Sequence, residues 1–274
     1  MWLRALIFVF LISFAALVYG TFRWKAGTRE LRAHLEAARG KLAPADSTLP
    51  PPVARYLALA LPPDQPSIAA VNLAHDGTFN LGSTSPHWSP FTSTQRVVTH
   101  RPGFDWDARI HMAPGVDAYV HDAYVDGVGI LQVEALAVLP MVDLRGTSDV
   151  AKGELQRFLA EAAWYPTRLR DLDWQPIDAN SARAILQDGD TTAALTFHFN
   201  ADGLIDTVRA DARPRLVKGV PTATPWEGRF WNYKSSDGIL VPTDGEVSWL
   251  LPDGPYPYWR GHLTNIEFQF EKAA

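Results

Sequence analysis

The sequence predicts a mainly β protein of the α+β class, with one curved antiparallel sheet, a helix against its face and a transmembrane helix before it. From Phe104 to Met112, apolar and ionic side chains alternate, and this period of two is typical of a strand with one dry face. Short strand patterns follow one another through turn pairs, which indicates antiparallel neighbours. An uncharged run, Ala5–Phe22, approaches the roughly 20 residues that span a bilayer.

Length and composition restrict the class of protein. The chain has 274 residues, of which 47% are hydrophobic and 11% aromatic, so a sizeable core is possible. The net charge of -5 argues against a nucleic-acid partner, because no basic excess is present to neutralise phosphates. The absence of cysteine excludes disulfides, thiolate metal sites and cysteine nucleophiles. We expect no cofactor and no metal.

The N-terminal run has several interpretations. It is an uncleaved signal anchor, a signal peptide cleaved after Gly20, or a buried core helix. We expect the membrane as a partner through this segment. The basic residues after the run outnumber Arg4 before it, which by the positive-inside rule favours a cytoplasmic location of the following domain. These residues are Arg23, Lys25, Arg29 and Arg32.

The chain divides into three parts. Residues 1–25 form the anchor or signal peptide, residues 26–52 an amphipathic helix and a Pro-rich linker, and residues 53–274 the curved β-sheet domain. In the second part Thr28 is suited to cap the helix, and Ala43–Pro52 is suited to a semi-rigid linker. The apolar stripe of the helix consists of Leu31, Leu35, Ala38 and Leu42.

The domain begins with a short helix, Val53–Leu61, which Pro62 and Pro63 end. Two sets of strands follow. The predicted strands are Ile68–Ala74, Thr78–Leu81, Thr94–Arg101, Phe104–Met112, Asp117–Val125, Gly129–Glu134, Ala182–Gln187, Thr191–Phe199, Ile205–Ala212, Gly228–Lys234, Val241–Leu251 and Tyr258–Phe270. The turn pairs are Asp76-Gly77, Pro114-Gly115, Asp126-Gly127, Asp188-Gly189, Asp202-Gly203 and Asp237-Gly238.

One helix interrupts the two sets of strands. Thr147 caps it, Asp149 lies in its first turn, and Pro166 follows its end. Glu154, Arg157 and Glu161 are explained by ordinary pairing three and four residues apart. The order of strands, helix and strands predicts a helix lying on the face of one sheet.

Ionic residues on neighbouring strands are candidates for chemistry. Asp105, Asp107, Arg109 and His111 share one strand face, and His121 and Asp122 come from the next strand. The cluster is either a solvated face with cross-strand ion pairs or an acid/base or metal site. The metal signal is weak because no motif of known ligand spacing is present, and nucleophile and phosphate-loop motifs are absent.

Several segments resemble an uncharacterised bacterial family of unknown function, over about residues 50–270. The segments are Pro52–Leu57, Trp88–Phe91, Pro102–Arg109, Asp122–Gly127, Gly153–Leu155, Ala162–Thr167 and Thr224–Arg229. The inferred architecture is also similar to the periplasmic lipoprotein-carrier (LolA-like) fold. That resemblance implies a strongly curved sheet, or half-barrel, with helices packed on or over a concave face that holds acyl chains.

These observations predict a membrane-anchored protein, periplasmic or extracellular, that binds a lipid or other hydrophobic ligand. The alternatives are a hydrolase-type enzyme using the Asp/His cluster at residues 105–122 and a non-catalytic envelope interaction module. The enzyme requires the cluster to converge in a concave pocket, and we assign no catalytic residue. The expected ligand-binding residues are Phe104, Trp106, Arg109, Trp164, Tyr165, Trp226 and Arg229.

Overall fold

The computed structural model describes residues 2–38, 40, 48–82 and 85–271. Within these residues one antiparallel sheet of 13 strands has the order β6-β5-β4-β3-β2-β1-β13-β12-β11-β10-β9-β8-β7. The strands are β1 Ile68–Asn80, β2 Trp88–Val98, β3 Gly103–Ala113, β4 Val116–Val125, β5 Val128–Ala135, β6 Leu139–Arg145, β7 Asp173–Asp178, β8 Ser181–Asp188, β9 Thr191–Phe199, β10 Ile205–Val217, β11 Val220–Ser236, β12 Ile239–Leu251 and β13 Gly254–Phe270. The helices are α1 Trp2–Ala37, α2 Pro51–Ala60 and α3 Ser148–Ala160, and two short 3-10 helices follow α3, η1 Glu161–Trp164 and η2 Pro166–Asp171.

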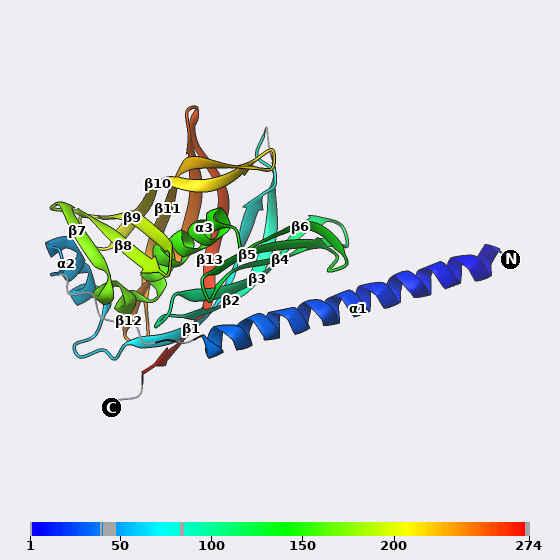
Figure 1. Ribbon diagram of the computed structural model, residues 1–274, viewed down its shortest axis with the longest axis horizontal. Helices are drawn as coiled ribbons and strands as arrows, with labels where there is room; N and C mark the ends of the chain where they lie inside the picture. Colours follow the sequence, from blue (N-terminus) through cyan, green and yellow to red (C-terminus); the bar gives the residue numbers. More distant parts are fainter. Residues whose placement is uncertain (1, 39, 41–47, 83–84, 272–274) are drawn as a thin grey trace.

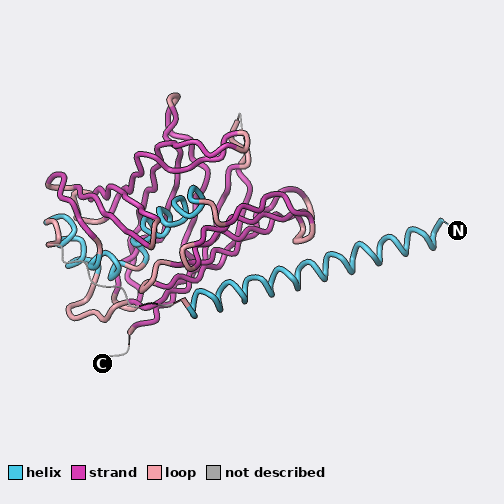
Figure 2. Tube along the Cα trace, in the orientation of Figure 1, coloured by secondary structure: helices cyan, strands magenta, loops and turns pink. Residues whose placement is uncertain are grey.

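The sheet is strongly curved around α3. Strands β5 and β9 stand nine places apart in the sheet order, which in a flat sheet would separate them by about 43 Å. Helix α3 nevertheless contacts both strands, although a helix is only about 10–12 Å across. Figures 1 and 2 show the helix inside the curve, with the edge strands β6 and β7 unpaired with each other. The predicted half-barrel with a helix on its concave face is confirmed.

Helix α3 is positioned by its cap and by a close approach to the sheet. The Thr147 hydroxyl accepts a hydrogen bond from the Val150 amide at 3.3 Å, as predicted. The apolar stripe is fully buried at Leu155 and Phe158. A Cβ on Gly129 of β5 would lie 2.5 Å from the Ala151 nitrogen, so only glycine allows the strand to lie this close to the helix.

Most predicted strands and turns are confirmed. Asp126 and Gly127, for example, have φ values of 52° and 83° in the β4–β5 turn, as the paired Asp-Gly signal requires. The sequence analysis missed the two edge strands, β6 and β7. Each contains a proline, Pro140 or Pro176, which interrupts the strand pattern and is tolerated at a sheet edge because no ladder hydrogen bond is lost there.

The predicted turn at Asp76-Gly77 is wrong. Both residues lie inside β1, where Gly77 pairs with Phe91 on one side and Gly261 on the other. A Cβ on Gly77 would lie 2.0 Å from the Arg260 carbonyl oxygen. The glycine is therefore required by close backbone approach between β1 and β13, not by turn geometry.

Helix α1 is one continuous element, not an apolar run followed by a separate helix. Its N-terminal part extends away from the sheet (Figure 1), and by length and composition it is able to cross a membrane. Thr28 lies inside the helix and does not cap it. Residues 41–47, which include Leu42 and part of the predicted linker, lie outside the described residues. Pro51 and Pro52 form the first turn of α2.

The two environments of glycine predict opposite effects of the same substitution. We expect Gly77→Ala to lower the free energy of unfolding by about 3 kcal/mol, because the new methyl group clashes with backbone. We expect Gly153→Ala, in α3, to raise it by about 0.5–1 kcal/mol, since nothing lies within 4 Å of the added Cβ. Urea unfolding of both variants measures the difference, and equal stabilities would contradict the assigned packing of β1 against β13.

Candidate functional site

The predicted Asp/His cluster lies partly on the outer face of the sheet, beneath the C-terminal part of α1. Asp105 is fully buried and accepts hydrogen bonds from Arg32 Nε at 2.9 Å and, when Nδ1 carries the proton, from His121 Nδ1 at 2.9 Å. The imidazole of His121 stacks on the Trp24 indole with 4.3 Å between ring centroids. These contacts bury Asp105 and His121 against the helix.

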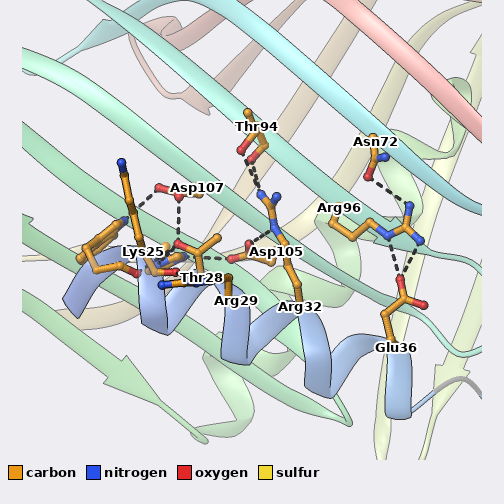
Figure 3. Close-up of polar contacts among 12 residues, drawn as sticks. Lys25, Thr28, Arg29, Arg32, Glu36, Asn72, Thr94, Arg96, Asp105 and Asp107 are labelled. Carbon is orange, nitrogen blue, oxygen red and sulfur yellow. Dashed lines mark hydrogen bonds and ion pairs between the residues drawn. The ribbon is translucent and has the colours of Figure 1, made fainter. Parts of the chain in front are cut away.

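Asp107 extends the same contact along α1. Its carboxylate accepts hydrogen bonds from Trp24 Nε1 at 3.0 Å and from the Thr28 hydroxyl at 2.9 Å. Further along the helix, Glu36 pairs with Arg96 of β2 at 2.6 Å. Figure 3 shows these side chains converging between α1 and the strands. The outer ionic face therefore binds the C-terminal part of α1, which favours the structural interpretation of the cluster.

The remaining members of the cluster are elsewhere. His111 pairs with Asp117 at 3.2 Å, and both side chains are nearly half exposed. Asp122 pairs in register with Trp106 and faces the concave side. The convergence that a hydrolase site requires is absent from these positions. Across the described residues, no group of three or more His, Cys, Asp or Glu is placed to hold a metal ion.

The concave side contains an open cavity of about 520 Å³. It lies between α3 and η1 on one side and strands from both halves of the sheet on the other. Aromatic side chains dominate the wall. They are Phe79, Trp106, Trp164, Trp226, Phe230, Trp249, Tyr256, Tyr258 and Trp259.

Three of the seven predicted ligand-binding residues, Trp106, Trp164 and Trp226, line this cavity with aromatic rings. Phe104 and Tyr165 are fully buried in the core and are not part of the wall. The other two predicted residues, Arg109 and Arg229, are described next.

Of the two predicted arginines, Arg109 lies on the outer face of the sheet and Arg229 borders the cavity. The Arg109 guanidinium lies 4.8 Å from the Tyr119 ring centroid, and by strand alternation it shares the outer face with Asp107. Arg229 borders the cavity but is exposed, and it alternates with Gly228 and Phe230, so its side chain points outward.

A buried ionic network forms one end of the cavity. Arg157 of α3 pairs with Asp122 and, at 2.7 Å, with Glu161, which also accepts a hydrogen bond from Gln95 at 2.6 Å. The Arg157 guanidinium lies 4.9 Å from the Trp106 ring centroid. Burial lowers the pKa of Arg157, but Glu161 and Asp122 outweigh it and the net pKa is raised, so this cation is neutralised within the protein.

Glu154 is the carboxyl group of the network whose pKa is raised. Burial, together with the nearby Asp122 carboxylate, raises the pKa of Glu154 well above its usual value, against the opposing effects of Arg213 and Arg157. Its Oε2 atom has no hydrogen-bond partner among the described residues. Burial therefore favours the protonated form of this carboxyl group.

Sequence reasoning assigned Glu154, Arg157 and Glu161 to the helix surface. A signal was present, because residues three, four and seven apart share one helix face. That face overlaps the apolar stripe containing Leu155 and Phe158, which predicts burial of the charged groups as well. Arg213 of β10, which also lines the cavity, was missed because it belongs to no motif.

The raised pKa of Glu154 predicts an unusual pH dependence of the free energy of unfolding. The folded protein retains a proton that the unfolded chain releases near pH 4.3, so this group destabilises the fold progressively as pH rises above that value. We expect Glu154→Gln to remove this decline, and its stability relative to the native protein should grow from pH 5 to pH 8. Urea unfolding at several pH values measures the trend.

Glu161→Gln is the matched control on the same helix. It removes a carboxylate that pairs with buried Arg157, so we expect a loss of about 3–5 kcal/mol across the same pH range. A parallel loss in both variants would show that Glu154 is ionised in the folded protein.

Known proteins provide a family but no activity. Among curated proteins, none matches the chain. Among solved structures, a LolA superfamily protein from Nitrosomonas europaea is 12% identical, with 81% of this chain and 93% of that chain covered and a TM-score of 0.42. A beta-barrel-like protein of the domain of unknown function DUF1849 from Brucella abortus is 13% identical, with 74% and 99% covered and a TM-score of 0.17. Both TM-scores lie below 0.5, and we infer neither ligand nor function from them.

The family model gives the assignment that the sequence motifs predicted. The model of DUF6920, a family of unknown function, matches residues 47–268. This range runs from the segment before α2 to the end of β13 and includes every residue of the cavity wall. The chain therefore belongs to the DUF6920 family of unknown function.

Proposed function

We propose that the protein is a membrane-anchored, extracytoplasmic binding protein for a lipid or other hydrophobic ligand. The observation that carries this proposal is the aromatic cavity of about 520 Å³ inside the curved sheet. Ligand sites commonly have volumes of about 300–1,000 Å³ and apolar walls with a few polar groups. The cavity has this size and composition, and it is open to the outside.

The wall is suited to binding apolar chains. Transfer of a ligand methylene from water to an apolar site contributes about 0.8 kcal/mol, so a few buried methylenes supply substantial affinity. The indoles of Trp164 and Trp226 are held by hydrogen bonds from their Nε1 atoms, to the Pro242 carbonyl at 3.0 Å and to the Tyr258 hydroxyl at 2.9 Å. These rings are therefore preorganised, which lowers the entropy cost of binding.

The anchor is proposed from α1. Its apolar part leads without interruption into the turns that bind the sheet through Trp24, Thr28 and Arg32. Two of the four basic residues after the run have partners in the domain, since Arg23 pairs with Glu134 and Arg32 with Asp105. Their presence is thus explained by folding, which supports an extracytoplasmic domain despite the positive-inside bias.

A cavity-filling substitution tests ligand binding. We expect the full chain, extracted gently and measured by native mass spectrometry, to carry lipid at stoichiometric level. Leu131→Trp should abolish co-purification, because Leu131 lies in the cavity wall. The control, Leu59→Trp, changes a residue that is 53% exposed on α2 and should leave the bound lipid unchanged. An empty native protein that also fails to take up fluorescent fatty acid or phospholipid would overturn the proposal.

The absence of cysteine allows a direct test of topology. Leu59→Cys on the domain and Trp2→Cys at the start of α1 each introduce a single thiol at an exposed position. With a membrane-impermeant maleimide on bacterial spheroplasts, we expect Leu59→Cys to react at once and Trp2→Cys only after lysis. The reverse pattern would place the domain in the cytoplasm, and an intact mass beginning at Thr21 would indicate a cleaved signal peptide.

A further inference from the structure

A second arginine faces the cavity without a carboxylate partner. Arg213 of β10 is 8% exposed and lines the cavity, with its guanidinium 5.0 Å from the Trp226 ring centroid. Within the part of the chain that the structure describes, its guanidinium forms no ion pair and no hydrogen bond. Burial of an unpaired charge is unfavourable, and an anion from outside the protein would relieve this cost.

The orientation of Arg213 depends on a strand irregularity. Ala210 pairs with Trp226 and Arg213 with Thr224, so β10 contains one residue more than β11 between these two pairs. The bulge reverses the alternation of faces that Val208 and Ala210 begin. It turns Arg213 toward the cavity, whereas regular alternation would place its side chain on the outer face.

The acidic groups of the cavity form no ion pair with Arg213 in the described structure. Asp122 and Glu161 pair with Arg157, and Glu246 pairs with Arg260 at 2.6 Å. Glu154 interacts electrostatically with Arg213, but the two side chains form no ion pair in the described structure, and burial raises the pKa of Glu154 well above its usual value. Arg213 therefore has no ion-pair partner among the described residues that line the cavity.

Arg215 adds a second cation beside the first. It lies two residues further along β10, on the same face and about 7 Å away, and its guanidinium is 5.7 Å from the Trp249 ring centroid. A guanidinium stacked on an aromatic ring leaves its N–H edge available for a planar or tetrahedral oxyanion. The two stacked arginines thus present donors beside an aromatic wall.

We propose that Arg213, assisted by Arg215, binds the anionic head group of an amphiphilic ligand whose apolar chain occupies the aromatic part of the cavity. The head group is a carboxylate or a phosphate ester, because both accept paired N–H donors from a guanidinium. The inference rests on the proposed function and assigns the head-group role to Arg213 in place of Arg109 and Arg229.

The test compares probes with one tail and different heads. The full chain in phosphatidylcholine nanodiscs is titrated with octyl phosphate, octanoate or octyl glucoside, with empty nanodiscs as the blank and tryptophan fluorescence as the signal. We expect the native protein to bind at least one anionic probe about tenfold or more tightly than octyl glucoside. Tighter binding of octyl phosphate would indicate a phosphorylated amphiphile, and tighter binding of octanoate a fatty acid.

Substitutions then assign the preference to one side chain. Arg213→Gln should remove the preference for anionic probes and leave the affinity for octyl glucoside unchanged, whereas Arg213→Lys should retain part of it. Arg183→Gln is the control, since Arg183 pairs with the exposed Asp211 away from the cavity. It should bind all three probes like the native protein.

The outcomes separate this inference from the proposed function. Equal affinity of the native protein for all three probes would overturn the anionic head group while supporting a hydrophobic ligand, and this result needs no variant to fold. An anionic preference that persists in folded Arg213→Gln would also overturn the assignment. Failure of every probe, with no lipid co-purified by the native protein, would overturn the proposed function itself.

Discussion

The position of α3 inside the curved sheet depends on the buried charge of Arg157. Its ion pairs join the helix to Asp122 of β4, and Glu161 at the end of the helix is held by Gln95 of β2. The other side of α3 packs against β9 and β10. Removing one partner of such a pair costs about 3–5 kcal/mol, because the remaining charge stays buried. The network therefore fixes the helix to one wall and leaves an open volume beside it.

Successive side chains of β3 point alternately into the cavity and toward α1, because a strand has a period of two residues. Trp106 faces the cavity, whereas Asp105 and Asp107 face α1. The ionic half of this pattern suggested chemistry in the sequence, but in the fold it joins the domain to its N-terminal helix. Aromatic residues on the concave face of the sheet line the cavity. Along this part of β3, a substitution at an even-numbered residue therefore affects the concave side, and one at an odd-numbered residue affects the contact with α1.

The sequence was sufficient where local rules decide the structure. Asp126-Gly127 formed the predicted turn because its dihedral angles are a local property, and Trp106 of the cavity wall follows from the alternating pattern of β3. Asp76-Gly77 was misinterpreted because the need for glycine comes from β13, which is distant in sequence. Arg213 was not predicted, because it belongs to no motif and because a bulge, set by pairing between β10 and β11, reverses its face. Such effects of tertiary pairing are absent from the local pattern.

The continuity of α1 determines how the domain stands relative to a membrane. A helix of 36 residues is about 54 Å long, and the turns that leave the proposed bilayer are the same turns that pack on β2, β3 and β4. No linker separates these two parts, so the helix acts as a rigid bracket instead of a flexible tether. The height and tilt of the cavity above the bilayer are then fixed by one helix axis. With the proposed anchor in the bilayer, the cavity opening stays close to the membrane, and a ligand must travel to it.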